Sequence, residues 1–356
     1  MQLEEGRRGG RVQTYERLVR NAEEVVTPEE LRELCGRSKK RAYIGIEPSG
    51  QAHLGWKILA DKLQDITAAG FETIVLLADW HAYINDKFGG DIEKIRTCAE
   101  YIKDALEALG VPRGSVRYVL ASEYIGERGY WERIIKISKA ASLSRIRRAM
   151  DIMGRKEEEA ELDSSRLLYP MMQVADIFHL DVDLAYGGMD QRKAHMLARD
   201  VAEKYGWKKV TALHTPLLPS LLGTERMDPV EAKMSKSRPD SAIFITDPPE
   251  EISRKLRAAF CPARQVQGNP VLEISRLIIL PALGVLKISR PAKWGGDIEV
   301  ASYEELARLY SSEELHPADL KSGAAEALSE ILAPVRQYFE RRPEGLDFVK
   351  GPGPRN

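Results

Sequence analysis

The sequence predicts an α/β fold, in which a doubly wound, mostly parallel sheet is followed by a helical C-terminal domain. Three observations predict it. Short apolar runs, which are typical of buried strands, recur through roughly the first two thirds of the 356 residues. Longer amphipathic stretches separate these runs, as the crossover helices of a parallel sheet must. After about residue 240 the strand-like runs become scarce and helical periodicity prevails.

The individual elements are predicted from apolar periodicity and from capping residues. A short helix at 28–34 begins after Thr27, a favourable N-cap residue. Buried strands are predicted at 42–46, 73–78, 116–120, 182–186 and 210–213. Helices are predicted at about 54–69, 91–110, 130–153, 167–179, 191–204, 249–260, 270–286 and 303–341. The charged stretch 155–163 is expected to be a solvated loop or helix end, and Asp247-Pro248-Pro249 marks a domain boundary near 240–250.

Composition argues against several classes of protein. Apolar residues make up 43% of the chain, and 53 basic against 54 acidic residues leave a net charge of −1. An anionic partner must therefore be met by local basic patches and not by the overall field. Cys35, Cys98 and Cys261 form no C-x-x-C pair, so we expect a reducing cytosol and neither a disulfide framework nor a zinc module. We expect no signal peptide and no membrane span either.

The first of two motifs that carry chemistry is the signature turn, Glu47–Gly55 (Glu-Pro-Ser-Gly-Gln-Ala-His-Leu-Gly). It lies between a predicted strand and a predicted helix, whose N-terminus offers free N–H groups to a phosphate. His53 can donate a hydrogen bond to a phosphate oxygen as charge develops. Gly55 lacks a Cβ, so an adenine or ribose could lie against its backbone. Taken alone, the turn is explained better by His53 as a helix cap and Gly55 as a turn glycine.

The second motif is the signature loop, Lys233–Ser237 (Lys-Met-Ser-Lys-Ser). Its two ammonium groups and two hydroxyls can wrap a triphosphate and stabilise the departing pyrophosphate. A polar surface loop is the plainer explanation of such a stretch by itself. The two motifs together, in this order and in an alternating strand-helix context, indicate an ATP site that activates a carboxylate by adenylation.

With both motifs the chain resembles the class I aminoacyl-tRNA synthetases of the tyrosyl/tryptophanyl subgroup. His53-Leu54-Gly55-Trp56 resembles the HIGH element of that family, with Trp56 in place of the second histidine, and the signature loop matches KMSKS at every position. The resemblance implies that His53, Lys233 and Lys236 are catalytic. It also implies an ATP site composed of Gly45, Gly50, His53, Gly55, Lys233, Met234, Ser235, Lys236 and Ser237.

Four further segments resemble archaeal and eukaryotic tyrosyl-tRNA synthetases, and the likeness covers roughly residues 25–340. The segments are 42–50, 77–83, 169–176 and 187–193. The resemblance implies that Tyr43 and Asp176 hydrogen-bond the phenol of the substrate, and that Tyr169, Gln173 and Gln191 hold its amino group and neighbouring atoms. The whole implied tyrosine site is Tyr43, Gly45, Ala78, His81, Tyr169, Gln173, Asp176 and Gln191.

The spacing of Tyr169, Gln173 and Asp176 is compatible with this site, because positions i, i+4 and i+7 share one face of a helix. A polar face that is buried needs a ligand or a partner. Without the resemblance, however, the solvent face of an amphipathic helix would explain these residues better. Tyr43, in an apolar strand, would then be a core residue.

Candidates for RNA contact are a basic run and two separate rings. The run 133–148 contains several arginines and lysines and no acidic residue, which suits phosphates but is also typical of a solvated helix face. The resemblance implies that Arg148, Arg192 and Lys193 contact the tRNA acceptor end. It implies that Trp294, His316 and Asp319 stack on and hydrogen-bond the first base of the anticodon.

The resemblance also implies a domain organisation and a set of partners. A mobile segment at 1–25 precedes a Rossmann-like catalytic domain at 26–245, with an inserted helical dimer and acceptor-stem region at about 85–165, and an anticodon-binding domain at 246–356. The expected protein is a cytoplasmic, homodimeric tyrosyl-tRNA synthetase that uses tyrosine, tRNA(Tyr) and ATP with Mg²⁺ and holds no protein-ligated metal. Three alternatives stay open: a tryptophanyl-tRNA synthetase, a catalytically silent RNA-binding relative, and a small-molecule adenylyltransferase.

Overall fold

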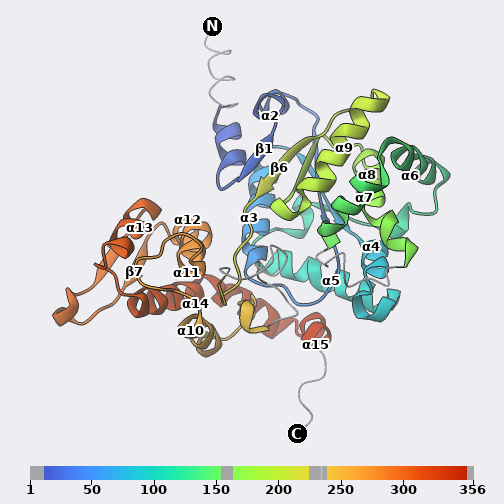
Figure 1. The fold of residues 1–356 in the computed structure, drawn as a ribbon. Coiled ribbons are helices and arrows are strands. Elements are labelled where there is room, and N and C mark those ends of the chain that lie inside the picture. Colours follow the sequence, from blue (N-terminus) through green and yellow to red (C-terminus); the bar gives the residue numbers. More distant parts are fainter. Residues whose placement is uncertain (1–11, 154–162, 224–233, 235–238, 351–356) are drawn as a thin grey trace. The chain divides into compact units, whose positions relative to one another are not determined.

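A six-stranded sheet forms the centre of the first two thirds of the chain (Figure 1). The computed structural model describes residues 12–153, 163–223, 234 and 239–350. The strand order is β1-β6-β5-β2-β3-β4, and only β1 runs antiparallel to its neighbour. The strands are β1 (Glu24–Val26), β2 (Arg41–Ile46), β3 (Glu72–Leu77), β4 (Arg117–Leu120), β5 (Leu184–Gly188) and β6 (Thr211–Thr215). The predicted α/β class with a mostly parallel sheet is confirmed; the antiparallel edge strand β1 was not predicted.

Apart from the helix at Asp79–Ile84, which was not predicted, helices connect the strands as predicted, with ends that differ by a few residues. They are α2 (Pro28–Cys35), α3 (Gly55–Ala68), α4 (Asp79–Ile84), α5 (Ile92–Ala108), α6 (Arg128–Ala140), α7 (Leu143–Ala149), α8 (Leu168–His179) and α9 (Arg192–Tyr205). The single helix expected at 130–153 is wrong. It is interrupted after α6, because the Ser142 side chain accepts the Arg145 N–H at 3.2 Å and so starts α7 as a new helix. The charged stretch expected at 155–163 lies almost wholly outside the described residues.

Capping explains why α2 begins at the predicted residue. The Thr27 hydroxyl accepts the Glu30 N–H at 3.2 Å, and the Glu30 carboxylate accepts the Thr27 N–H at 3.2 Å. This reciprocal pair satisfies two backbone donors that a helix start leaves without partners. Arg199 of α9 donates to both oxygens of Glu30, at 2.6 and 2.9 Å, so the same carboxylate also ties α2 to α9.

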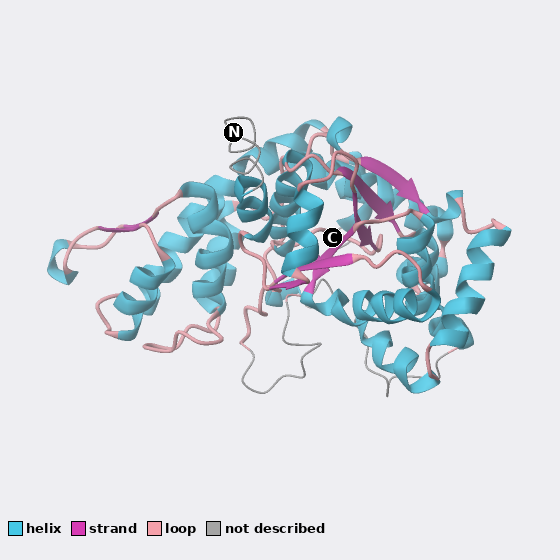
Figure 2. Ribbon diagram, turned by 90° about the horizontal axis from the view of Figure 1, so that it is seen from above, coloured by secondary structure: helices cyan, strands magenta, loops and turns pink. Residues whose placement is uncertain are grey.

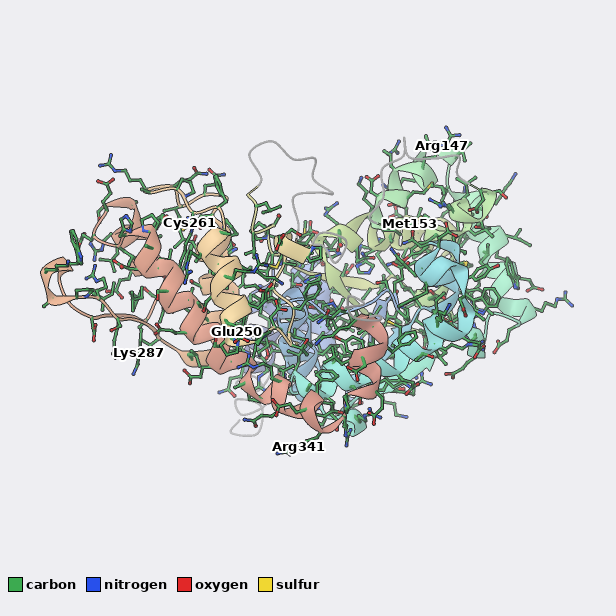
Figure 3. All side chains as sticks on the ribbon, turned by 90° about the horizontal axis from the view of Figure 1, so that it is seen from below. Arg147, Met153, Glu250, Cys261, Lys287 and Arg341 are labelled. Carbon is green, nitrogen blue, oxygen red and sulfur yellow. The ribbon has the colours of Figure 1, made fainter. Side chains whose placement is uncertain are left out.

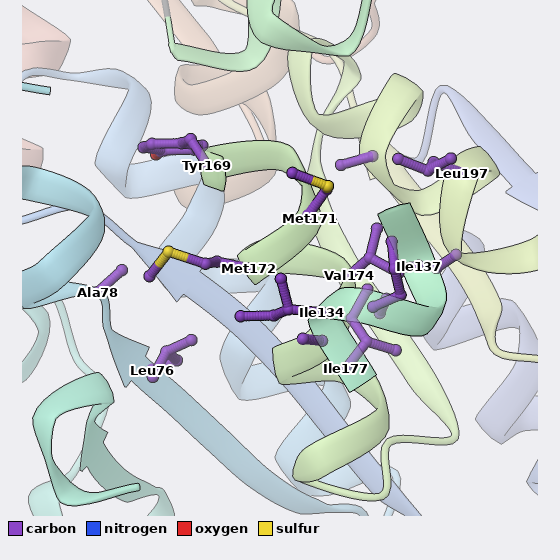
Figure 4. Close-up of a cluster of buried hydrophobic side chains, with 14 of the residues drawn as sticks. Leu76, Ala78, Ile134, Ile137, Tyr169, Met171, Met172, Val174, Ile177 and Leu197 are labelled. Atoms are coloured by element: carbon purple, nitrogen blue, oxygen red, sulfur yellow. The ribbon is translucent and has the colours of Figure 1, made fainter. Parts of the chain in front are cut away.

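A buried apolar cluster fixes α8 against the sheet (Figure 4). It contains Leu76 of β3, Ile134 and Ile137 of α6, and Met172 and Ile177 of α8. These side chains are all buried, and burial of a large aliphatic side chain contributes about 1.5–3 kcal/mol to folding. The cluster therefore holds α8 between α6 and the sheet.

The order of the strands creates a switch point between β2 and β5. Tyr43 of β2 is in register with Ile74 of β3 on one side and with Ala185 of β5 on the other. The chain leaves β2 and β5 at the same edge of the sheet, since the two strands are parallel. Ligands of open α/β sheets bind in the crevice at such a point.

The last third of the chain is mainly helical, as predicted. Its elements are α10 (Pro249–Ala258), α11 (Pro270–Ile274), α12 (Leu280–Leu283), α13 (Tyr303–Ser311), α14 (Pro317–Arg341) and α15 (Glu344–Lys350), with a hairpin of β7 (Leu286–Ile288) and β8 (Ile298–Val300). Figure 2 shows helices and loops dominating this part. The helix expected at 270–286 is broken by a π-helical turn and ends before β7, and the one expected at 303–341 is two helices.

Backbone contacts divide the described residues into two compact units. The first contains the residues up to Ser49 and Leu59–Pro216, and the second contains Gly50–Ile58 and the residues from Leu217 onward. The signature turn thus begins in one unit and ends in the other. These compact units divide at Pro216 and Leu217, and the domain boundary expected near 245 stays a prediction. None of the described helices combines the length and the apolar character needed to cross a membrane.

Candidate active site

Asp176 is the polar centre of a buried site on α8. Its side chain has no exposed surface, and its Oδ1 accepts hydrogen bonds from the hydroxyls of Tyr124 and Tyr130, each at 2.8 Å. Burial, reinforced by the nearby carboxylate, raises the pKa of both tyrosines, so each keeps its proton and donates. Two charge-assisted bonds to one oxygen hold the carboxylate in a single orientation.

The second oxygen of Asp176 has no hydrogen-bond partner among the described residues. His81 of α4 lies beside it, with Nε2 3.2 Å from Oδ2, but the alignment is not that of a hydrogen bond. The Tyr43 hydroxyl likewise lacks a partner among these residues, although Tyr43 is buried. Burial raises the pKa of Tyr43, and the Asp176 charge adds to the rise. Burial of two polar atoms without hydrogen-bond partners lowers the stability of the fold, unless a ligand provides those partners.

A second group of polar side chains extends the site toward the switch point. The Gln173 amide donates to Oε1 of Gln191 at 3.0 Å, and it also lies close enough to Tyr43 to offset part of that pKa rise. Gln191 ends the short turn that follows β5. Tyr169 packs edge-on against His81, with ring centroids 5.0 Å apart, and burial raises the pKa of its hydroxyl well above the usual value. The structure therefore brings the predicted residues of β2, α4, α8 and the β5 turn together.

Two small residues leave room for this arrangement. A Cβ at Gly45 would lie 2.9 Å from the Tyr43 hydroxyl, so only glycine lets the phenol fold over β2. Ala78 is buried where β3 leads into α4, and its N–H donates to the Ile46 carbonyl at 2.9 Å. Both positions were predicted from the resemblance, and both lie in the wall of the buried site.

Several residues that support the site were not predicted. Tyr124 and Tyr130 are far from Asp176 in sequence, and no local pattern marks them as its partners. Asn85 donates to Glu47 Oε1 at 2.8 Å and to the Met153 carbonyl at 3.1 Å, which ties the start of the signature turn to the end of α4. A buried asparagine just after a short helix was the one available signal, since such a residue needs partners.

The His53 side chain caps the N-terminal end of α3. Its Nδ1 accepts the Gly55 N–H at 3.1 Å, and a Cβ at Gly55 would lie 2.8 Å from Cε1 of the ring. Gly55 is therefore needed to accommodate the histidine, a reason that the sequence alone did not indicate. Because Nδ1 accepts, the proton of the neutral ring is on Nε2. Gly50 has φ +117°, which favours glycine, and Trp56 is buried at 7% exposure.

The signature turn is hydrogen-bonded to the segment that follows the signature loop. The Leu54 N–H donates to the Ile243 carbonyl at 2.7 Å, and the Ile245 N–H donates to the Ala52 carbonyl at 3.2 Å. Met234 is buried, and its N–H donates to the Leu218 carbonyl at 3.1 Å. The predicted Lys233, Ser235, Lys236 and Ser237 lie outside the described residues.

The residues predicted to contact the tRNA acceptor end lie on α7 and at the start of α9. Arg148 is exposed on α7, beside Arg147 (Figure 3). Arg192 donates through Nε to both oxygens of Glu24, at 2.9 and 2.8 Å, and Lys193 is paired with Asp151. An RNA phosphate would therefore compete with Glu24 for Arg192 and with Asp151 for Lys193.

The residues predicted to read the anticodon lie in the second unit. His316 accepts the Ala318 N–H at 3.1 Å as the cap of α14, and Asp319 follows in its first turn. Trp294 lies between β7 and β8 and is 65% exposed. A cavity of about 570 Å³ between α10 and α14 is lined by His316 and by two cations that were not predicted, Arg257 and Lys321.

Comparisons with known proteins fit this geometry. A family described as tRNA synthetases class I (W and Y) matches residues 37–333. The tyrosine–tRNA ligase of Aeropyrum pernix is 52% identical over 333 residues, which cover 90% of this chain and 92% of that protein. The chain belongs to the class I tyrosyl-tRNA synthetases. The predicted family, of archaeal type, is confirmed.

Solved structures of the same family match the fold over almost its whole length. The tyrosyl-tRNA synthetase of Aeropyrum pernix has a TM-score of 0.85 at 46% identity and covers 96% of this chain and 98% of its own. That of Pyrococcus horikoshii, complexed with L-tyrosine, has a TM-score of 0.88 at 42% identity and covers 96% and 99%. A Rossmann-like catalytic fold with a helical C-terminal part is therefore that of the family.

No dedicated metal centre is found in the part of the chain that the structure describes, since no three His, Cys, Asp or Glu side chains gather there. None of Cys35, Cys98 and Cys261 forms a disulfide.

Proposed function

We propose that the chain is a tyrosine–tRNA ligase, which activates tyrosine with ATP and transfers it to tRNA(Tyr). The observation that carries the proposal is a pair of buried polar atoms, Asp176 Oδ2 and the Tyr43 hydroxyl, next to the switch point of the sheet. Neither atom has a hydrogen-bond partner among the residues that the structure describes. A substrate phenol satisfies both: its O–H donates to Oδ2 and its oxygen accepts from Tyr43. The activity named for relatives of about 50% identity supports it.

The same pair explains selectivity against phenylalanine. Phenylalanine fills the same space but offers neither a donor nor an acceptor, so both buried groups would lose water without gaining a partner. Tyrosyl-tRNA synthetases are the standard example of this effect and reject phenylalanine by about 10⁵ without an editing step. An indole is also a poor substitute, because it is larger and its N–H cannot accept from Tyr43. The tryptophanyl alternative is therefore not favoured.

The amino end of the substrate is assigned to Tyr169, Gln173 and Gln191. The Gln173 side-chain N–H already donates to Gln191 Oε1. This bond orients the side-chain oxygen of Gln173, which can then accept from the ammonium group of the substrate. The Tyr169 hydroxyl stays protonated and can accept a further bond. These groups hold the substrate so that its carboxylate faces the α-phosphorus of ATP, and such positioning is a large part of catalysis in a two-substrate reaction.

Adenylation needs charge stabilisation and no protein nucleophile. The tyrosine carboxylate attacks the α-phosphorus, the bond to the bridging oxygen breaks, and pyrophosphate leaves with the Mg²⁺ that arrives with ATP. His53 is assigned to the phosphates through its Nε2 proton, and Lys233 and Lys236 to the departing pyrophosphate. Loss of one such donor typically lowers the rate by about 10²–10³. The 2′- or 3′-hydroxyl of the terminal tRNA ribose then attacks the activated carbonyl and displaces AMP.

The tRNA is assigned to two regions. Arg148, Arg192 and Lys193 are proposed to meet phosphates of the acceptor end, and Trp294, His316 and Asp319 the first base of the anticodon. The exposed Trp294 ring and the cation-lined cavity beside His316 support the second assignment, because single-stranded bases are read by stacking and by edge hydrogen bonds. A catalytically silent RNA-binding relative would not need the buried phenol site.

We also propose a homodimer in the cytoplasm. Ile135 on α6 is 66% exposed and Leu143 on α7 is 55% exposed, and Trp131 is exposed on the same helix as Ile135. Exposed apolar residues grouped in this way typically mark a contact surface, and the surface lies in the predicted dimer region. Light scattering of Ile135→Asp tests it: a lower mass than the parent protein supports the dimer, and an unchanged dimer mass contradicts it.

The decisive experiment is ATP–pyrophosphate exchange with each of the twenty amino acids. Tyrosine alone is expected to support exchange above background. Exchange with tryptophan in its place, or with no amino acid, would overturn the proposal. Charging of tRNA(Tyr) with labelled tyrosine then tests the second step.

A further inference from the structure

Lys255 is a buried cation that the scheme above does not use. It lies on α10, and its side chain is 3% exposed. Its Nζ is 2.7 Å from Asp247 Oδ2 and 3.7 Å from Glu251 Oε1, and it lies 4.7 Å from the centroid of the Phe244 ring. A charge is expensive to bury, so a lysine at such a position is tolerated only because the carboxylate and the ring compensate its desolvation.

Asp247 links the Lys255 side chain to the backbone of Phe244. The same Oδ2 that pairs with Lys255 accepts the Phe244 N–H at 2.9 Å, and the Asp247 N–H donates to the Phe244 carbonyl at 3.1 Å. The turn from Phe244 to Asp247 is thereby closed on both sides. Because Lys255 holds the carboxylate and also covers the ring, it fixes Phe244 in two independent ways.

Phe244 in turn lies opposite His53. The two residues form an isolated antiparallel bridge, flanked by the Leu54–Ile243 and Ile245–Ala52 hydrogen bonds at 2.7 and 3.2 Å. The Gln51 amide donates to the Thr246 hydroxyl at 2.9 Å, which fixes the register. The short segment 243–246 therefore pairs with the signature turn and fixes the position of its backbone. We call this segment the template.

We propose that Lys255 is a positioning residue for adenylation, which acts on His53 through Asp247 and Phe244. The inference rests on the proposed function of His53. A small displacement of a group that stabilises charge in the transition state lowers the rate without weakening substrate binding, and an error of 1 Å can cost about 10²-fold. Removal of the Lys255 charge should therefore slow adenylation while the tyrosine site, which lies in the other unit, keeps its affinity.

The test uses the full-length protein and the variant Lys255→Met, which keeps the apolar stem and removes the charge. Single-turnover adenylate formation at saturating tyrosine and ATP is expected to fall by about 10-fold or more, with an unchanged KM for tyrosine. Hydrogen exchange of the Leu54 and Ile245 amides should become faster, since these report the template directly. In the double variant Lys255→Met/Asp247→Asn the stranded carboxylate is neutralised, so part of the rate and of the amide protection should return.

Lys62→Met is the matched control. Lys62 is also a buried lysine paired with an aspartate, Asp65, at 3.3 Å, so its loss measures the general effect of removing a buried ion pair. It should lower stability but leave the adenylation rate and the two amides as in the parent. If Lys255→Met does not fold, Asp247→Asn carries the test, because it removes the charge that pairs with Lys255 and weakens the acceptor of the Phe244 N–H. Adenylation should then slow and the two amides should exchange faster, and parent-like values of both would overturn the inference.

The outcomes separate the inference from the function on which it rests. Faster amide exchange together with slower adenylation supports it. An unchanged rate in Lys255→Met, or a slower rate with fully protected amides, overturns it. His53→Ala serves as the reference: if it is slow while Lys255→Met is fast, only the inference fails. If His53→Ala itself keeps the parent rate, the proposed role of His53 fails, and the inference with it.

Discussion

At the scale of single residues, the two oxygens of Asp176 have different tasks. Oδ1 is held by Tyr124 and Tyr130, whereas Oδ2 has no partner among the described residues. The family resemblance predicts Asp176, and its spacing on the helix is only compatible with that role. Neither predicts the two tyrosines, because contacts across many residues depend on packing that no local pattern encodes. The chemistry of the residue was therefore foreseeable and its support was not.

We expect Asp176→Asn to lower the preference for tyrosine over phenylalanine by about 10- to 100-fold, because a buried group left without its partner costs about 1–3 kcal/mol. Asparagine has the same shape as aspartate, so the fold of this variant should persist. Pyrophosphate exchange with both amino acids gives the ratio, and circular dichroism verifies folding. Asp181→Asn, at an exposed aspartate, is the control. A folded variant with the parent's ratio would remove Asp176 from the specificity site.

A pair of buried histidines makes stability depend on pH. His195 Nδ1 lies 3.0 Å from His214 Nε2, and His214 Nδ1 lies 3.0 Å from Glu24 Oε2. Burial, together with the neighbouring His214, lowers the pKa of His195 to about 3, and burial also lowers that of His214. The unfolded chain therefore binds more protons than the folded one between about pH 3 and the ordinary histidine pKa near 6.5.

The contribution of His195 to stability is complete above about pH 6.5 and is lost as the pH falls toward 3. The slope approaches about 1.4 kcal/mol per pH unit for this one group. His195→Gln should flatten the decline in the free energy of unfolding between pH 7 and 5, as measured by urea denaturation. An equally steep decline in His195→Gln would show that other groups cause it.

At the scale of elements, the sequence predicts most helices near the site but misses features that depend on single caps or on long-range pairing. The sequence predicts α2, α3, α8 and α9 well, because their apolar periodicity, and for α2 also the Thr27 cap, are local features. It misses the break between α6 and α7, where one serine cap outweighs a continuous helical pattern. It also misses β1, whose three residues become a strand only through pairing with β6.

At the start of α3, one substitution is expected to slow adenylate formation without lowering thermal stability. Alanine in place of a helix glycine ordinarily stabilises by about 0.5–1 kcal/mol. In Gly55→Ala, however, the new Cβ would lie 2.8 Å from the His53 ring and displace it. We expect adenylate formation to slow by about 10-fold or more without a matching fall in the melting temperature. A parent-like rate would mean that the place of His53 does not matter; Gly114→Ala, where a Cβ meets nothing within 4 Å, is the control.

At the scale of the whole molecule, activation of tyrosine and recognition of tRNA are assigned to different parts of the chain. The phenol site is composed of residues between Tyr43 and Gln191, and the candidate anticodon residues come from Trp294 onward. The family resemblance predicted this division, but Arg257 and Lys321 emerge only from the structure, since the cavity brings together two helices that are distant in sequence.

We expect Trp294→Ala and Asp319→Ala to impair charging of tRNA(Tyr) and to spare pyrophosphate exchange. Loss of a stacked ring costs about 1–3 kcal/mol of binding per base, and loss of a base-edge acceptor relaxes the preference at one nucleotide. Charging of the cognate tRNA and of one altered at the first anticodon base separates the two effects. The exposed Lys350→Ala provides a control. If both variants charge both tRNAs like the parent, these residues do not read the anticodon.

The edge strand β1 has a consequence for synthesis on the ribosome. Glu24 pairs with His214, so β1 finds its partner only after 190 further residues have been made. The parallel strands β2, β3 and β4 can associate earlier, because their partners follow within shorter loops. The N-terminal segment must therefore wait while the sheet grows, and its docking on β6 should be among the last events of folding. A nascent chain stalled before β6 has emerged would be nicked by a protease near residue 24, and a released chain would resist.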